Sequence, residues 1–406
     1  MIEAPTIDKL LGMDYYVYEG LNLGDVLEFR KSPNTFRVFE VSLDGVKASF
    51  NICFEGDVAE KLTSKYVHYV LCKEGVDTFY AIQLLKKFFK ADIGYAGLKD
   101  SDSYSCQFIS LNTNNLRNSD GLIRASYSLG PLRLCFYRSS HYPVRSGYLL
   151  GNLFNVFLNF IAPQNVVMER LRGVEDLLKS MMLPNYYGYQ RFGTIRPITH
   201  LVGKAIVRRA WDEATRLIAG APHVLESESV IRAREEFESG NFRKAYKLFS
   251  SDYWIERIVC RAMMMYGDPL KAINSLPIEI LNFYVEAYQS YLFNKALSKA
   301  LRHLGGVESV SNTCETLIVP GTNMALRDGI CESFVREVMN AEGVEQQHFL
   351  VRDLNINCRS YVRESTFKVK DLNLNFVTDG VWMEFMLIRG CYASILLREL
   401  FKGTAY

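Results

Sequence analysis

The stretch of the chain with the plainest potential for chemistry is Gly94-Tyr95-Ala96-Gly97-Leu98-Lys99-Asp100, in which a turn of small residues delivers a single carboxylate. Glycine at positions 94 and 97 can take positive φ, which suits a turn that approaches a ligand closely. Residues 104–111 alternate polar and apolar as a half-buried strand does, so Asp100 is expected where a loop meets a strand. A carboxylate in such a place can act as a nucleophile or accept a proton. Taken alone, however, the pattern more often marks an ordinary connecting turn.

Four further stretches combine amide, aromatic and glycine residues in a way that suits a binding site. Such density in a loop is more often functional than the same density in a core. For the stretch that begins at Ala287, which has helical spacing, packing between domains is an equal alternative. The four are Gly151-Asn152-Leu153-Phe154, Asn185-Tyr186-Tyr187-Gly188-Tyr189-Gln190-Arg191-Phe192-Gly193, Ala287-Tyr288-Gln289-Ser290-Tyr291-Leu292-Phe293-Asn294, and Gly390-Cys391-Tyr392-Ala393-Ser394 with the following Leu396-Leu397-Arg398-Glu399-Leu400.

The overall composition is that of a soluble globular protein, with 49% hydrophobic and 23% charged residues over 406 positions. This length suits two or three domains, because single cores rarely grow past ~250–300 residues. The net charge of +2 provides no field that would attract a polyanion, so any contact with nucleic acid has to be a local basic patch. Candidates lie at 86–90, 208–209 and 243–247, and the alternative for each is a solvated helix face.

Neither the cysteines nor the histidines are spaced as metal ligands. The nine cysteines form no Cys-x-x-Cys pair, and the six histidines form no His-x-x-x-His pair. We therefore expect reduced, mostly buried thiols and no metal site. The first 11 residues lack a basic segment followed by an apolar one, and no run of ~18 apolar residues occurs. The sequence thus predicts a cytoplasmic protein without a membrane span.

Strand-like and helical segments divide the chain into parts of different character. Short strands are expected between residues 15 and 160, with a helix over 77–90 that leads into the Gly-rich turn. Residues 200–305 have the pattern of successive helices, the longest over 278–304 with Gly305 as its C-cap. Residues 310–405 return to mixed strands and helices. This order favours an α+β protein in which a largely helical domain interrupts another domain.

Taken together in this order, the five stretches resemble the TruD family of tRNA pseudouridine synthases from about residue 36 to residue 400. The resemblance implies a catalytic domain with a mixed, mainly antiparallel sheet over residues 1–188 and 375–406, interrupted by a largely helical α/β inserted domain over 189–374. It also implies a cofactor-free isomerase whose partner is tRNA and which we expect to act as a monomer. Such an enzyme breaks the base–ribose bond of a uridine, usually at position 13, rotates the base and rejoins it through carbon 5.

The same resemblance assigns roles to particular residues. The Asp of the Gly-Leu-Lys-Asp motif is the family's catalytic residue and corresponds to Asp100. Asn152 and Phe154 correspond to the residues that hydrogen-bond the catalytic carboxylate and stack on the flipped base. We expect Lys99 and Arg191 to contact phosphate or the catalytic carboxylate, with a structural salt bridge as the alternative. The expected substrate-binding residues are Phe154, Asn152, Lys99, Arg191 and Gln107.

After Asp100 the chain departs from the family's pattern. The family usually has a basic residue followed by Ala-Val-Thr-x-Gln, whereas this chain has Ser101-Asp102-Ser103-Tyr104-Ser105-Cys106-Gln107. Asp102 thus places an acid beside the catalytic carboxylate, which weakens the local attraction for phosphate. The alternative function is therefore an RNA-binding protein of the same fold whose catalytic site is weakened or lost. A scaffold built on the helices of 200–305, with no affinity for RNA, is a third hypothesis.

Overall fold

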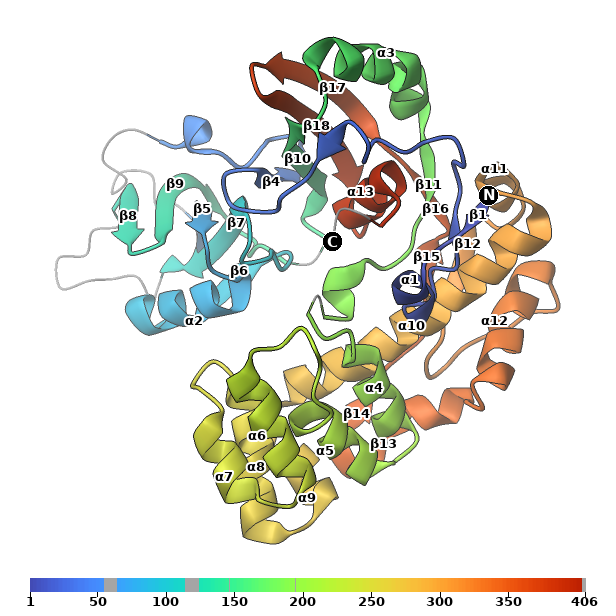
Figure 1. The fold of residues 1–406 in the computed structure, drawn as a ribbon. Helices are drawn as coiled ribbons and strands as arrows, with labels where there is room; N and C mark the ends of the chain where they lie inside the picture. The colour runs from blue at the N-terminus through green and yellow to red at the C-terminus, as the bar shows by residue number, and fades with distance from the viewer. Residues whose placement is uncertain (55–63, 114–123, 146, 194, 404–406) are drawn as a thin grey trace. The chain divides into compact units, whose positions relative to one another are not determined.

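The computed structural model has the predicted α+β fold (Figure 1). It describes residues 1–54, 64–113, 124–145, 147–193 and 195–403.

The chain forms two compact units. One, here called the sheet unit, consists of Leu21–Met182 and Phe367–Tyr406. The other, here called the helical unit, consists of Met1–Gly20 and Leu183–Thr366. Each unit is therefore discontinuous in sequence. The domain boundaries expected from the sequence, at 188/189 and 374/375, stay predictions.

The sheet unit is built on a ten-stranded sheet with the order β17-β18-β10-β4-β7-β5-β9-β8, in which β3 also pairs with β10 and β6 with β7. Only β4 and β7 pair in parallel among the described strands of this sheet, so it is mixed and mainly antiparallel. The strands are β3 (Leu27–Glu28), β4 (Phe36–Ser42), β5 (Tyr66–Glu74), β6 (Ile93–Tyr95), β7 (Tyr104–Asn112), β8 (Ser126–Leu129), β9 (Leu132–Ser140), β10 (Leu149–Phe160), β17 (Lys370–Val377) and β18 (Gly380–Ile388).

The described α-helices of the sheet unit are α2 (Thr78–Phe89), α3 (Gln164–Ser180) and α13 (Ala393–Phe401). The predicted helix before the Gly-rich turn is confirmed as α2. It begins where the Asp77 carboxylate accepts a hydrogen bond from the amide of Tyr80, and it buries an apolar stripe that includes Ile82 and Leu85. This stripe packs against β5, β7 and β9, so α2 covers that end of the sheet (Figure 1). The turn that carries Asp100 therefore starts from a well-packed helix.

The two faces of the sheet differ in chemistry where β4, β10 and β18 lie side by side. Alternation predicts Phe36, Val38 and Glu40 on one face of β4, and all three are buried. The register places Phe154 beside Val38, and Asn152 beside Glu40. We call this side the Phe154 face. The opposite side carries Arg37 and is called the Arg37 face.

The helical unit is dominated by α10, whose bounds and Gly305 C-cap agree with the sequence-based prediction. The first residues of the chain are anchored on this helix, because the Asn294 amide donates to the Leu11 carbonyl and Ser298 donates to Gly12. Its helices are α1 (Thr6–Leu10), α4 (Thr199–Val207), α5 (Trp211–Ala219), α6 (Glu228–Glu238), α7 (Phe242–Leu248), α8 (Trp254–Tyr266), α9 (Pro269–Asn274), α10 (Ile278–Leu304), α11 (Val307–Thr313) and α12 (Ile330–Ala341).

Short strands complete the helical unit: β1 (Ile2–Glu3) pairs with β2 (Tyr15–Tyr16), β12 (Thr316–Val319) with β15 (Tyr361–Glu364), and β13 (Leu350–Val351) with β14 (Ile356–Asn357). The strands β11 (Met182–Pro184) and β16 (Thr366–Lys368) lie where the chain passes from one unit to the other. Among the described helices, even the 27-residue α10 lacks the apolar character that a bilayer crossing needs.

The expectation that all cysteines are free thiols is wrong for six of them. Disulfides join Cys53 to Cys135, Cys72 to Cys106, and Cys314 to Cys331. Cys72 and Cys106 lie directly opposite each other on β5 and β7, a proximity that depends on strand register and leaves no mark in sequence spacing. Cys260, Cys358 and Cys391 are buried thiols outside these disulfides, as expected.

Candidate active site

Asp100 lies in the loop between β6 and β7, close to the start of β7, as the sequence predicts. Its Oδ2 atom is 2.9 Å from Lys31 Nζ, and the Asp100 side chain is 37% exposed. The Lys31 ammonium also lies over the Phe36 ring, 5.3 Å from its centroid. The site thus contains an accessible carboxylate that is held from one side by a single cation.

The backbone of this loop is held by the buried side chain of Lys73, a residue that is only 1% exposed. Lys73 Nζ donates hydrogen bonds to the carbonyl oxygens of Val76 at 2.7 Å, Lys99 at 3.2 Å and Asp100 at 2.9 Å. Burial lowers the pKa of Lys73 to about 8, against a smaller opposing effect of the Asp100 carboxylate. A buried ammonium that serves three carbonyls holds the Asp100 backbone in place.

Thr78 and Gln107 complete the support of the loop. The Lys99 amide donates to Thr78 Oγ1 at 2.8 Å, and Thr78 Oγ1 lies 3.1 Å from Gln107 Oε1. Gln107 Nε2 reaches the Gly97 carbonyl at 3.5 Å, and its side chain is fully buried. The structure therefore places Gln107 beneath the loop, where its amide organises the turn.

Lys99 turns away from the Asp100 carboxylate and forms a buried ion pair with Glu40 on β4. Lys99 Nζ is 2.7 Å from Glu40 Oε1, and the two side chains are 7% and 0% exposed. Glu40 Oε2 also accepts a hydrogen bond from the Phe108 amide on β7 at 2.9 Å. Of the two roles considered for Lys99, this is the structural salt bridge, and it ties the loop to the centre of the sheet.

The two glycines of the turn are not there for the positive φ that the sequence suggested. Neither Gly94 nor Gly97 has a positive φ, so the turn does not depend on that freedom. A Cβ on Gly94 would instead lie 2.7 Å from the Val144 carbonyl oxygen and would overlap Ser110 Oγ. Glycine is required there because another segment approaches the backbone closely.

Phe154 and Asn152 lie on the Phe154 face of β10, two residues apart. The Phe154 ring stacks on Phe385 with centroids 5.3 Å apart, lies 6.0 Å from Phe36, and belongs to a residue that is 7% exposed. Lys31 contacts Phe36, so the aromatic cluster is continuous with the cation that holds Asp100. Within the described residues the buried Asn152 Oδ1 has no hydrogen-bond partner, and the expected hydrogen bond from the Asn152 amide to the Asp100 carboxylate stays a prediction.

Arg191 belongs to the helical unit, in the short 3-10 helix Tyr189–Arg191. Its guanidinium is 2.9 Å from Glu286 Oε2 and donates to Ser290 Oγ at 3.2 Å. It also lies over the Phe283 ring, 5.1 Å from the centroid. The salt bridge considered as the alternative for Arg191 is therefore present, and a contact with phosphate stays a prediction.

Comparison with known proteins decides the family. A family model described as tRNA pseudouridine synthase D (TruD) matches residues 10–312 and 308–400. The chain belongs to the TruD family. A curated relative from Saccharolobus solfataricus named "Probable tRNA pseudouridine synthase D" is 32% identical over 98% of this chain and 97% of its own. A relative of the same name from Pyrobaculum islandicum is 33% identical over 99% of this chain and 98% of its own.

A crystal structure assigned to TruD from Methanosarcina mazei has a TM-score of 0.67 and covers 99% of both chains. At 22% identity this likeness shows the fold. The predicted family, its α+β fold and its standing as an enzyme family of tRNA pseudouridine synthases are thus confirmed.

Lys31 and Lys73 are the site residues of this TruD member that sequence reasoning missed. Lys31 precedes Asp100 by 69 positions, and Lys73 precedes it by 27. A lysine at the end of a strand-like run, as Lys73 is, is more often solvated than buried, so no local signal identifies it. Within the described part of the chain no group of three or more His, Cys, Asp or Glu could hold a metal ion.

Proposed function

We propose that this chain isomerises a specific uridine of tRNA to pseudouridine, with Asp100 as the catalytic carboxylate and without a cofactor. The observation that carries the proposal is the accessible Asp100 side chain, paired with Lys31 on a loop whose backbone is anchored by Lys73. The target expected from the family's usual activity is the uridine at position 13. The monomeric state and the cytoplasmic location expected from the sequence are kept as parts of the proposal.

The reaction exchanges one bond of the base for another. The N1–C1′ bond breaks, a C5–C1′ bond forms, and the hydrogen on C5 leaves as a proton while N1 gains one. The Asp100 carboxylate can form a transient bond to the base or to the ribose and can accept the proton from C5. Lys31 keeps one carboxylate oxygen oriented and leaves the other available to the substrate.

Phe154 and Asn152 are proposed to receive the base after it leaves its stack. Unstacking costs a few kcal/mol, and an aromatic platform returns ~1–3 kcal/mol per base. Phe154 is held flat by Phe385, so its ring plane is fixed before the substrate arrives. The unpaired Asn152 Oδ1 would accept the N3–H of the uracil ring. This role leaves the Asn152 Nδ2 group available for the expected hydrogen bond to Asp100.

The test is pseudouridine formation on unmodified tRNA. Carbodiimide labelling and primer extension map each new pseudouridine as a stop, and Asp100→Asn should remove the stop made by the wild type. Asp102→Asn is the matched control, because Asp102 lies on the same loop, is exposed and pairs only with Ser101 Oγ at 3.4 Å among the described residues. Equal stops with wild type and Asp100→Asn would overturn the catalytic role.

The second candidate is an RNA-binding protein of the same fold with a weakened or lost site. It is favoured by the acid at 102, where the family usually has a basic residue. Two results together would support it: salt-sensitive binding of tRNA, and no formation of pseudouridine in any of a range of tRNA and messenger RNA substrates. Formation of pseudouridine by the wild type alone would exclude it.

A further inference from the structure

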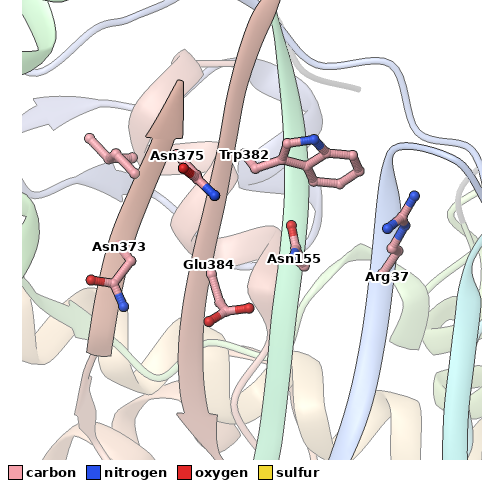
Figure 2. A pocket seen from close by; sticks show the side chains of 7 residues that line it. Arg37, Asn155, Asn373, Asn375, Trp382 and Glu384 are labelled. Carbon is pink, nitrogen blue, oxygen red and sulfur yellow. The ribbon is translucent and has the colours of Figure 1, made fainter. Parts of the chain in front are cut away.

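The Arg37 face of the sheet unit contains a hollow of about 340 Å³ that the proposed reaction does not use. Figure 2 shows side chains from four adjacent strands converging there. Because successive side chains of β10 point to opposite sides, Asn155 faces this hollow while Phe154 faces the candidate active site. The lining residues are Arg37, Asn155, Asn373, Leu374, Asn375, Trp382 and Glu384.

The polar side chains form an ordered row across the strands. Arg37 of β4 is in register with Asn155 of β10, which is in register with Glu384 of β18, and Glu384 with Asn373 of β17. At about 4.8 Å per strand, the backbones of Arg37 and Glu384 are about 10 Å apart, with Asn155 of β10 between them. Among the described residues neither side chain takes part in an ion pair, and the Arg37 guanidinium lies over the Trp382 ring instead. The hollow therefore offers a cation and a carboxylate that no ion pair neutralises among the described residues.

Two further features favour a flat ligand with hydrogen-bond donors. Trp382 lies above the row (Figure 2). The Arg37 guanidinium is 4.6 Å from the centroid of its ring, and the Phe157 ring is 5.0 Å away. Asn155 Oδ1 is buried and has no hydrogen-bond partner in the described part of the chain. A buried acceptor without a donor is costly, so a ligand that donates to it gains affinity.

We propose that this hollow binds one unstacked nucleotide whose base carries an exocyclic amino group. The base takes the place of the Arg37 guanidinium on the Trp382 ring, its amino group donates to Glu384 and Asn155, and Arg37 pairs with its phosphate. Uridine lacks the amino group, so the site discriminates against the base on which the active site acts. The ligand is either a free nucleotide or one nucleotide of an RNA strand, since both present the same chemistry.

Other ligand classes fit the residues less well. Glu384 repels a phosphate-rich ligand that would lie along the whole row, and an apolar ligand would leave Glu384 and Asn155 unsatisfied. An arginine-bearing peptide would pair with Glu384, but it would place a second cation beside Arg37. A nucleotide satisfies the cation, the ring and the acceptors together.

Trp382 fluorescence measures binding directly in a Trp211→Phe/Trp254→Phe background, where Trp382 is the remaining tryptophan. We expect saturable quenching by at least one of AMP, CMP and GMP, about tenfold weaker binding of UMP, and none by ribose 5-phosphate. Glu384→Gln should remove the preference for nucleotides with an exocyclic amino group over UMP. Arg37→Met should weaken the binding of nucleotides and leave the binding of nucleosides unchanged. Comparing the affinities of trinucleotides and mononucleotides shows whether the ligand is one nucleotide of an RNA strand or a free nucleotide.

Three outcomes would overturn the proposal: no saturable quenching by any mononucleotide or trinucleotide, equal affinity for UMP, or unchanged preference in Glu384→Gln. Asp100→Asn in the same background should bind as the wild type does, because the hollow lies on the opposite face from Phe154. A negative isomerisation assay and a negative nucleotide-binding assay are therefore independent results, and each can be recognised without the other. Unchanged thermal melting of Glu384→Gln confirms that the variant is folded.

Discussion

Replacing Lys99 by Met should destabilise the sheet unit severely, because it leaves the Glu40 carboxylate buried without a cation. Glu40 is 0% exposed, and its ion pair with Lys99 is 2.7 Å long. Removing one partner of a buried pair costs about 3–5 kcal/mol. The loss should be visible as a lower melting temperature, by about 6–20 °C at 2–4 °C per kcal/mol for a folded unit of about 150–250 residues.

The matched control is Lys179→Met. Lys179 and Glu175 form an ion pair of similar length, 2.6 Å, in the same unit, but their side chains are 51% and 42% exposed. An exposed pair of this kind contributes less than about 1 kcal/mol. The double variant Lys99→Met/Glu40→Gln should recover much of the loss, since the neutral side-chain amide introduced on β4 would keep an acceptor oxygen for the Phe108 amide.

The assay is thermal or denaturant unfolding in the Trp211→Phe/Trp254→Phe background. There, Trp382 reports the sheet unit alone, because the two replaced tryptophans belong to the helical unit. Equal losses in Lys99→Met and Lys179→Met would refute the reasoning. So would a double variant that is less stable than Lys99→Met alone.

The remaining predictions concern the loop, the helix α3 and the stacking platform. Turnover by the wild type should fall as pH rises through about 8, because a neutral Lys73 amine has only two N–H donors for three carbonyls. The variant Lys73→Met should turn over more slowly, and its rate should not fall near pH 8. Between about pH 8 and 10.5 the unfolded state binds more protons, so the free energy of unfolding of the wild type should rise relative to Lys73→Met. Gly94→Ala should lower the melting temperature, whereas Gly173→Ala inside α3, where a Cβ meets nothing within 4 Å, should stabilise by about 0.5–1 kcal/mol. Phe154→Leu should lower kcat/KM by about 5–150-fold, the equivalent of ~1–3 kcal/mol of stacking, with a small change in melting temperature, and an unchanged kcat/KM would contradict the role of Phe154.

Local patterns were sufficient to predict the elements that carry the site. The alternation of residues 36–42 fixes which side chains of β4 share a face, since the period of a strand is two residues. The helical spacing of residues 77–90 predicts α2 within about two residues. Asp100 is placed correctly at a loop–strand junction for the same reason.

The partners of Asp100 could not be predicted, because they depend on which strands become neighbours. Lys31, Glu40 and Lys73 meet the loop only after β4 and β5 have paired with β7, and the parallel pairing of β4 with β7 leaves no sequence signal. The cysteine pairs Cys72–Cys106 and Cys53–Cys135 depend on the same long-range assembly. Likewise, no pattern in the first 20 residues indicates that they join the helical unit.

The central claim is tested most directly by the release of tritium from tRNA labelled at carbon 5 of uridine. Isomerisation replaces the C5–H bond by a C5–C1′ bond, so each turnover releases one tritium to water. In single-turnover reactions, the wild type and Asp102→Asn should release tritium, and Asp100→Asn should remain at background while its affinity for the tRNA changes by less than about threefold, or ~0.7 kcal/mol. Release by Asp100→Asn at the wild-type rate would contradict the assignment of Asp100 as the catalytic carboxylate.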